Sequence, residues 1–405
     1  MTKSLLKILS SSVVTQALGI LIMPFLVNSY KPEQIALLAF FTAFVGVASV
    51  FLTMKCENQL FQVGVDEDAR AYAVFICCAA LILCVLCAPM AYFFSDTFDD
   101  LASGMIVVFL LGSLFFAIHN VLLNLLLRFN ATSPYSISKV VRSGSEFLCY
   151  VVCLLALFDE LALVVSSILA YLLAFSYSAK CIFKHVGCFQ IWGRVKKGCS
   201  LFFDMKGNIG LDFLSSLLNA VSINMPVIYF GMAGDPKLAG IYFMITRFLS
   251  APLLLIGQSV SAALKGHAFA EKKKKNGVMS SVNYTLRLLF IYFAPAYVVI
   301  TLVVYFGFPV FFGPEWQGIT EISLIMLPYI FSRFLFNCLS GMVYVIGEFR
   351  ANLLFQAALF VVSLMVFYLP VFEGLKIEAY STGLAACYLL FAFYVVARCR
   401  RWSLS

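Results

Sequence analysis

Long apolar runs, separated by short polar segments, occupy almost the whole chain. A helix needs about 20 mostly apolar residues to cross the hydrocarbon core of a bilayer. Twelve runs meet this length, at residues 9–29, 34–54, 71–94, 101–127, 138–158, 161–183, 208–233, 238–262, 284–312, 319–346, 351–372 and 378–397. The pattern therefore predicts an all-α polytopic membrane protein with about 12 transmembrane helices.

The composition of the 405 residues agrees with this prediction. Hydrophobic residues make up 62% of the chain and charged residues only 12%. In soluble domains, roughly half of the residues are hydrophobic and about a quarter are charged. The mean hydropathy is +0.98. A soluble globule must still cover its surface with polar groups, and a disordered chain is poor in apolar residues. Both classes are therefore excluded.

The distribution of Lys and Arg predicts the orientation. If the N-terminus is cytoplasmic, 22 of the 28 Lys and Arg residues lie at cytoplasmic segments. The opposite side then holds only Lys31, Lys237 and Lys376. Cytoplasmic loops of membrane proteins carry such an excess of positive charge, so both termini are expected in the cytoplasm. The net charge of +8 is explained in the same way, and we expect no nucleic-acid partner.

A long basic loop near residues 184–206 divides the predicted spans into two sets of six. Met23-Pro24 and Met225-Pro226 lie late in the first span of each set, which favours a parallel repeat. In such transporters the substrate site lies between the repeats. The predicted parts are an N-terminal six-helix lobe at 1–183, a cytoplasmic basic linker at 184–207, a C-terminal six-helix lobe at 208–397 and a cytoplasmic tail at 398–405. The basic loop could also bind anionic membrane lipids.

Sequence motifs of several enzyme classes are absent. The chain contains no GxxxxGK[ST] phosphate loop, no HExxH and no GxSxG, and its three His residues lie on different segments. Cysteines such as Cys84 and Cys87 lie within an apolar run, where ordinary packing explains them. We therefore expect a protein that is not an enzyme and that needs no cofactor or metal.

Polar residues inside the spans indicate where a transport site lies. Arg333 is near the middle of span 319–346, and Tyr329 and Asn337 follow the same helix face at steps of four. Arg247 and Gln258 lie along a similar face of span 238–262. A charge in the membrane usually faces a bundle interior or a wet cavity. The uncharged polar residues could equally be contacts that hold helices together.

Further candidates lie nearer the cytoplasmic ends. Arg128 could line the cavity or extend to the lipid headgroups. Asp212 and Glu146 are candidates for ion coupling or counter-charge, although Glu146 could pair locally with Arg142. With Asn224, the predicted substrate-binding set is Arg333, Arg247, Asn337, Tyr329, Gln258, Asn224 and Arg128. Because guanidinium groups match phosphate oxygens, such a cavity favours an anion.

Several stretches resemble the polysaccharide-transport family of the multidrug/oligosaccharidyl-lipid/polysaccharide (MATE-like) exporter superfamily, and in particular its Wzx-type O-antigen flippases. The second-half stretches are Asn224-Met-Pro226, Phe230-Gly231, Ala239-Gly240-Ile-Tyr242, Arg247, Ala251-Pro252, Ile256-Gly257 and Phe312-Gly313-Pro-Glu315-Trp316. The first-half stretch is Tyr30-Lys-Pro32-Glu33 with Glu57. Gln34-Ile35 departs from the family, which often has Phe-Gly there.

The resemblance implies a two-lobed, MATE-like transporter in the bacterial inner membrane. It implies that undecaprenyl-diphosphate-linked O-antigen units are flipped from the cytoplasmic to the periplasmic leaflet during lipopolysaccharide biosynthesis. An O-antigen polymerase and a chain-length regulator are then candidate partners. Two alternatives stay open. A drug or cation exporter of the same fold would favour carboxylates deep in its cavity, and a membrane O-antigen polymerase or ligase would favour a large periplasmic loop.

Overall fold

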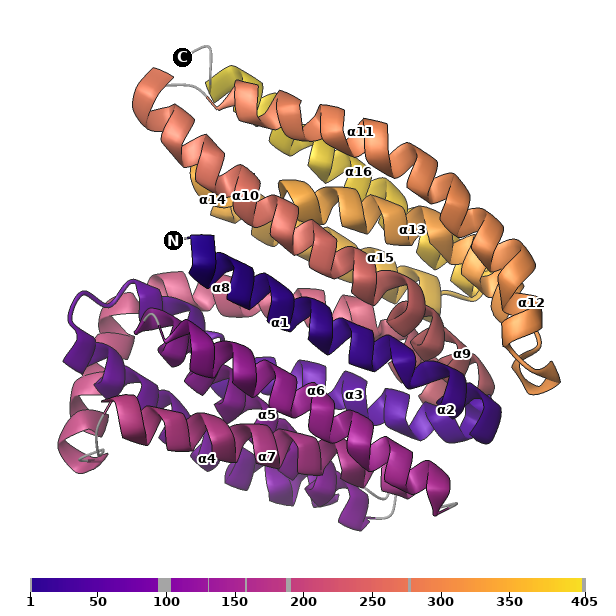
Figure 1. The fold of residues 1–405 in the computed structure, drawn as a ribbon, viewed down its shortest axis with the longest axis horizontal. Coiled ribbons are helices and arrows are strands. Elements are labelled where there is room, and N and C mark those ends of the chain that lie inside the picture. The colour runs from indigo at the N-terminus through magenta and orange to yellow at the C-terminus, as the bar shows by residue number, and fades with distance from the viewer. Residues whose placement is uncertain are drawn as a thin grey trace. The chain divides into compact units, whose positions relative to one another are not determined.

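The computed structural model describes residues 2–93, 103–129, 131–156, 159–186, 191–275 and 278–402. Helices make up its secondary structure, and no strand occurs within these residues. The predicted all-α fold is therefore confirmed. The chain divides into two compact units, Met1–Pro236 and Lys237–Ser405, coloured indigo to pink and orange to yellow in Figure 1.

The first unit contains a break in its first predicted span. Pro24 lacks a backbone N–H, and the chain turns at Ile22 between two helices. The helices of this unit are α1 (Thr2–Leu21), α2 (Met23–Ser29), α3 (Pro32–Thr53), the 3₁₀-helix η1 (Cys56–Phe61), α4 (Asp66–Phe93), α5 (Ser103–Arg128), α6 (Thr132–Leu155), α7 (Glu160–Val186) and α8 (Ile191–Met232).

The second unit contains two short π-helical segments, each joined to α-helices on both sides. Its elements are α9 (Pro236–Ile245), the π-helix η3 (Thr246–Ser250), α10 (Ala251–Lys275), α11 (Met279–Leu302), the π-helix η4 (Val303–Gly307), α12 (Phe308–Phe311), the 3₁₀-helix η5 (Pro314–Trp316), α13 (Ile319–Leu339), α14 (Gly341–Ile346), α15 (Phe349–Tyr368), the 3₁₀-helix η6 (Pro370–Phe372) and α16 (Lys376–Trp402).

Eleven of the helical stretches within the described residues are long and apolar enough to cross a membrane, and each corresponds to a predicted span. The remaining predicted span, 138–158, corresponds to α6, which carries Lys139, Arg142 and Glu146. Its 24 residues would extend about 36 Å, enough to cross a hydrocarbon core of about 30 Å. The charges of α6, rather than its length, set it apart from the other spans.

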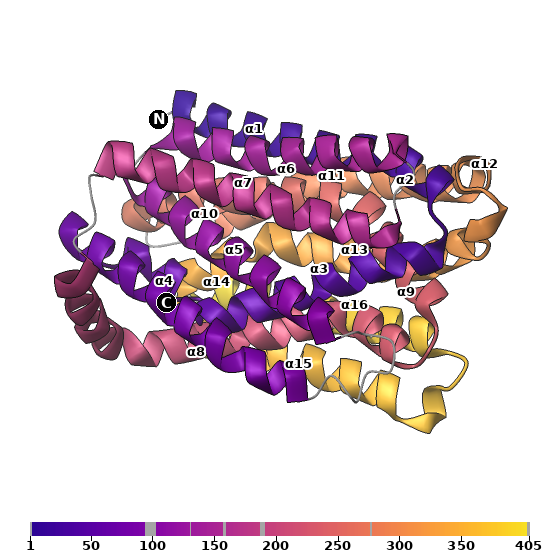
Figure 2. The same cartoon turned by 90° about the horizontal axis from the view of Figure 1, so that it is seen from below.

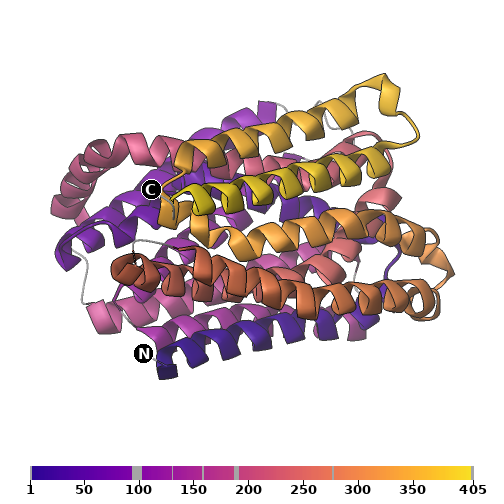
Figure 3. The same cartoon turned by 90° about the horizontal axis from the view of Figure 1, so that it is seen from above.

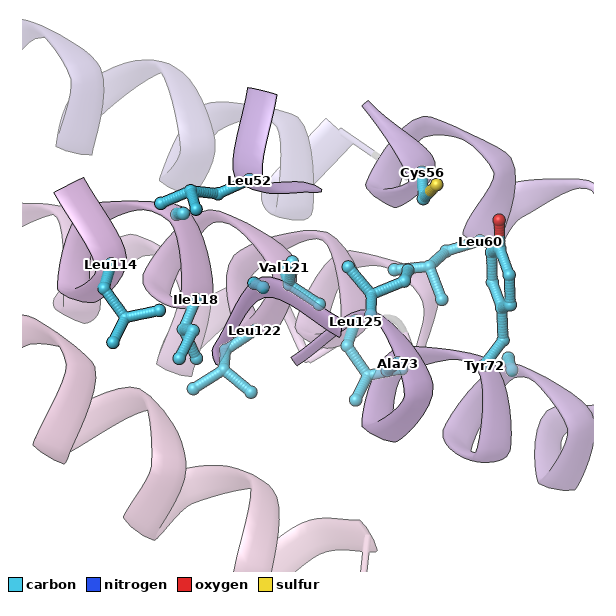
Figure 4. Packing of buried hydrophobic residues seen from close by; sticks show 14 of the residues in the cluster. Leu52, Cys56, Leu60, Tyr72, Ala73, Leu114, Ile118, Val121, Leu122 and Leu125 are labelled. Carbon is cyan, nitrogen blue, oxygen red and sulfur yellow. The ribbon is translucent and has the colours of Figure 1, made fainter. Parts of the chain in front are cut away.

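The core of the first unit gathers residues from α3, η1, α4 and α5. Leu60, Tyr72 and Leu125 are each fully buried there, and Figure 4 shows their side chains packed together. On α5, Val121 and Leu125 belong to one helix face, because residues four apart lie above one another. The polar residues of α5 lie on another part of the helix surface, toward α6.

The predicted linker at 184–207 is largely helical. α7 continues to Val186, and α8 begins at Ile191 and runs without interruption into the next span. α8 belongs to the first compact unit, although it was predicted to begin the second lobe. Compactness does not decide where an internal repeat begins, so the two six-helix lobes stay a prediction. Helix α16 likewise includes residues 398–402 of the predicted tail.

Candidate functional site

A cavity of about 210 Å³ opens between α5 and α6 in the first unit. At about 30 Å³ for each water, it has room for roughly seven water molecules. The residues that line it are His119, Asn120, Leu123, Asn124, Leu127, Tyr135, Lys139 and Arg142. Most of these side chains are polar, so this is a wet site rather than an apolar void. We call it the α5–α6 pocket.

The α5 wall of the pocket presents amides and an imidazole. Asn120 and Asn124 are four residues apart, and Asn124 Nδ2 donates to the Asn120 carbonyl oxygen at 3.0 Å. His119 is 1% exposed, and its Nδ1 lies 3.2 Å from Ser178 Oγ on α7. This bond fixes the imidazole plane and leaves His119 Nε2 buried with no hydrogen-bond partner in the described structure.

The α6 wall carries two cations three residues apart, which places them on one helix face. Lys139 Nζ donates to Ser12 Oγ of α1 at 2.9 Å and lies 5.4 Å from the centre of the Tyr135 ring. The Arg142 guanidinium carbon lies 5.7 Å from the centre of the Phe116 ring. Among the described residues, neither cation forms an ion pair. The pocket therefore has the electrostatics of an anion site.

Sequence reasoning missed these two cations as site residues. It assigned Lys139 and Arg142 to the cytoplasmic positive charge, because they come soon after a predicted loop. The structure begins α6 at Thr132, so Arg142 lies about 15 Å along the helix axis. The spacing of three residues between Lys139 and Arg142, both inside the predicted span 138–158, was the signal that could have identified them.

The second unit encloses Arg333 among tyrosines. Arg333 Nη1 donates to Tyr329 Oη at 3.3 Å, one turn back on α13. Tyr329 is fully buried, and its ring centre lies 5.6 Å from that of Tyr380 and 6.0 Å from that of Tyr388, both on α16. Arg333 forms no ion pair within the described part of the chain. The structure thus brings Arg333 and Tyr329 together, as their spacing predicted.

The rest of the predicted stripe on α13 packs against a neighbouring helix. A Cβ built at Gly257 of α10 would lie 3.1 Å from Asn337 Cβ, so the helices approach closely there. Ser340 Oγ lies 3.1 Å from Ser261 Oγ, which also accepts from the Gly341 backbone N–H at 2.8 Å. These contacts match the interpretation of small polar residues as contacts between helices. A substrate role for Asn337 stays a prediction.

Arg247 lies within the π-helix η3. π-Helical turns are rare and are found frequently at functional sites. The Arg247 guanidinium carbon lies 5.0 Å from the centre of the Phe243 ring, so the charge rests on an aromatic face. Gln258 is exposed on α10. Their roles in binding substrate stay predictions.

Arg128 connects the end of α5 to the segment before α4. Its Nη2 donates to the carbonyl oxygens of Val63 at 2.6 Å and Gly64 at 3.1 Å, and lies 3.5 Å from Asp66 Oδ1. These bonds give Arg128 a structural role in closing this end of the unit. Its predicted role in substrate binding stays a prediction.

The other first-unit candidates lie on α6 and α8. Glu146 accepts from Tyr150 Oη at 3.0 Å, and Asp212 accepts from Asn58 Nδ2 at 2.9 Å. Asn224 Nδ2 donates to the Ala220 carbonyl oxygen at 2.8 Å, within its own helix. Asp212 therefore ties α8 to η1, and ion coupling by Asp212 or Glu146 stays a prediction.

Within the described residues, no three His, Cys, Asp or Glu side chains gather as ligands for a metal ion. The polar groups of the α5–α6 pocket are instead two cations, two amides, an imidazole and a phenol, and the cations and amides can donate hydrogen bonds to oxyanions. The chemistry available in both units is therefore the recognition of negative charge inside an apolar helix bundle.

Residues 1–264 match the sequence family described as "Polysaccharide biosynthesis protein". The chain belongs to this family. This membership confirms the resemblance to polysaccharide transporters. No curated protein sequence matches the chain.

Solved structures with a similar fold are transporters. The chain is similar to an inward-facing multidrug resistance MATE family transporter of the MOP superfamily, with a TM-score of 0.69, 14% identity, and 97% of this chain and 98% of that chain covered. It is also similar to a MATE in the straight conformation, with a TM-score of 0.68, 16% identity, and coverage of 98% and 94%. The eukaryotic MATE transporter AtDTX14 gives a TM-score of 0.60, 14% identity, and coverage of 99% and 96%. The chain is a multi-pass membrane protein with a MATE-like fold.

Proposed function

We propose that the protein is a flippase. It moves an undecaprenyl-diphosphate-linked O-antigen repeat unit from the cytoplasmic to the periplasmic leaflet of the bacterial inner membrane by alternating access. The observation that carries this proposal is the occurrence of interior cations that form no ion pair among the described residues. They are Arg333 in one unit and Lys139 and Arg142 in the other, in a chain of the polysaccharide biosynthesis family.

The chemistry of the substrate fits these residues. A diphosphate cannot cross hydrocarbon alone, because a charge there loses its hydration. A guanidinium group presents a planar fork of N–H donors that matches phosphate oxygens, and an ammonium acts as a point charge. The polyprenyl tail would stay in the lipid while the anionic head and its sugars pass along the protein. The amides of Asn120 and Asn124 would offer donors and acceptors to sugar hydroxyls.

A drug or cation exporter is the second candidate, because the solved neighbours include multidrug MATE transporters. The interior charges argue against this alternative. Lys139, Arg142 and Arg333 would repel a cationic drug, whereas they would attract a phosphate. We therefore place the flippase first.

The test is complementation of flippase-deficient strains that make repeat units of defined structure. A flippase should restore surface polysaccharide and deplete single lipid-linked units from the cytoplasmic leaflet. Purified protein in liposomes should also move a fluorescent polyprenyl-diphosphate oligosaccharide between leaflets. A protein that exports a cationic dye but moves no lipid-linked sugar would contradict the proposal.

The proposed orientation places both termini in the cytoplasm. Reporter fusions at Lys197 should then give cytoplasmic activity, and a fusion at Glu315 should give periplasmic activity. A periplasmic signal at Lys197 would reverse the orientation and the direction of transport with it.

A further inference from the structure

Helix α8 is much longer than a membrane span. Its 42 residues extend about 63 Å, whereas the hydrocarbon core is about 30 Å thick. The stretch apolar enough to cross is Ile209–Met232. The turns that precede it therefore lie outside the span, and Figure 2 and Figure 3 show them as an arch beside the beginning of α4.

The inner face of this arch is fixed against α4. A Cβ at Gly198 would lie 2.6 Å from the Ala71 carbonyl oxygen and 2.5 Å from Phe75 Cβ, so only glycine allows this approach. The Phe202 ring centre lies 5.6 Å from that of Phe75. Lys197 forms an ion pair with Asp68 at the flank. This part of α8 is consequently a packed helix and not a free loop.

The outer face combines lysines with an exposed aromatic ring. Lys196, Ser200 and Phe203 follow one another at steps of four and three, which places them on one face, and Lys206 lies at its edge. Phe203 is 61% exposed. Phe203 comes six residues before Ile209, about 9 Å along the helix, and the arch reduces its distance from the hydrocarbon further. In a bilayer whose hydrocarbon core begins at Ile209, this places the ring close to the lipid headgroups.

We propose that residues 194–206 of α8 form an interfacial helix that rests on anionic phospholipid headgroups. Phe203 inserts at the boundary of the acyl chains, and Lys196 and Lys206 contact lipid phosphates. Helices that lie in a membrane interface combine Lys or Arg on a polar face with Phe, Leu or Trp on an apolar one. A cation close to an anionic membrane surface strengthens binding roughly fivefold. Asp204, on the opposite edge from Lys206, weakens the positive charge of the face.

Two adjacent substitutions give a matched test. Phe203→Trp and Phe202→Trp are each reconstituted as full chains in vesicles of phosphatidylcholine and phosphatidylglycerol in equal parts, and in phosphatidylcholine alone. The signal is the fluorescence difference from the unsubstituted chain. Brominated phosphatidylglycerol should quench Trp at 203 strongly, and it should quench Trp at 202, which faces α4, far less. The emission maximum of Phe203→Trp should also lie at shorter wavelength than that of Phe202→Trp. Both results together support insertion of residue 203 into the lipid.

The charge part of the proposal needs lysine variants in the Phe203→Trp background. Replacing Lys196 and Lys206 together by Gln should remove the preference for phosphatidylglycerol over phosphatidylcholine as quencher. Lys180→Gln, which removes an exposed lysine of α7, should leave this preference unchanged. Asp204→Asn, which removes a negative charge from this face, should strengthen the preference for phosphatidylglycerol.

Three outcomes would overturn the proposal. If iodide quenches the Phe203→Trp variant and neither brominated lipid does, the outer face lies in water. Equal quenching by both lipids would remove the anionic specificity. Trp at 203 that is shielded from iodide and unquenched by lipid would mean that a second protein surface covers the face. Because the readout requires no transport, none of these outcomes depends on the proposed function.

Discussion

The two units keep positive charge inside the bundle by different means. In the first unit, Lys139 and Arg142 line an open cavity of about 210 Å³. In the second, Arg333 donates to Tyr329, which is fully buried against the rings of α16. Water can solvate the first pair of charges, which also lie over the Tyr135 and Phe116 rings, whereas the second charge donates to a phenol oxygen.

This difference has a consequence for transport. The α5–α6 pocket can accept an anion with little rearrangement, because it already offers space and two cations that form no ion pair within the described part of the chain. Arg333 is half-buried and commits one of its five N–H donors to Tyr329, so an anion would meet its other donors in a more enclosed place. We therefore expect the pocket to govern the first contact with substrate, and Arg333 to govern a later step in the second unit.

The largest effect should come from removing the enclosed charge. Arg333→Ala should abolish flipping, and Arg333→Lys should retain only part of it, because an ammonium cannot form the bidentate fork. Charge-assisted hydrogen bonds contribute about 1.5–3 kcal/mol each, so losing the fork should cost roughly tenfold or more in affinity. The measurement is the flipping rate in liposomes, normalised to folded protein. An Arg333→Ala variant that accumulates normally and flips at the wild-type rate would assign the anion step to Arg247 or the pocket instead.

Neutralising the open pocket should have the next largest effect. The double variant Lys139→Gln, Arg142→Gln should slow flipping by about tenfold at low substrate, and high substrate should restore part of the rate, because the loss is in initial binding. Lys180→Gln removes one exposed positive charge on α7 outside the pocket and serves as control. If the double variant loses maximal rate and not affinity, the proposed division between pocket and Arg333 is wrong.

Glycine substitutions compare the open surroundings of α6 with the packed contact between α10 and α14. A Cβ at Gly341 would lie 2.8 Å from the Ser261 carbonyl oxygen, so Gly341→Ala should destabilise the second unit by about 1–3 kcal/mol. Gly144 on α6 has nothing within 4 Å of its Cβ position. Gly144→Ala should therefore stabilise its helix by up to about 1 kcal/mol. The unfolding temperature of each variant in detergent checks both expectations. Equal shifts in that temperature would contradict the contrast between an open and a packed region.

The smallest effect should come from the Tyr329 hydroxyl. Tyr329→Phe removes one hydrogen bond to Arg333 but keeps the ring contacts with Tyr380 and Tyr388. Side-chain hydrogen bonds within membrane bundles contribute about 0.6 kcal/mol on average, so the unfolding temperature should fall only slightly. Flipping should not slow, since the guanidinium of Arg333 keeps its charge and all of its donors. A strong loss of flipping at normal protein level would show that the phenol itself contacts substrate.

The amino-acid sequence by itself determined the helical spans. A membrane-spanning helix satisfies its backbone hydrogen bonds internally, so its position depends on a local run of apolar residues that can be read directly. Eleven predicted spans were found in this way. The twelfth, α6, is helical as well, but Lys139, Arg142 and Glu146 lower its apolar character. The neighbouring relation of Tyr329 and Arg333 was equally predictable, since both lie on one helix at a fixed spacing.

Tertiary structure alone decided which polar face meets a cavity and which meets another helix. Asn337 and Arg333 share one stripe in the sequence, yet Asn337 packs at Gly257 while Arg333 turns to Tyr329. The α5–α6 pocket and the docking of α8 on α4 depend on which helices become neighbours. Periodicity fixes the direction of a side chain around its own helix axis. It carries no information on the partner at that face, because helix–helix contacts depend on shape and spacing between segments far apart in the chain.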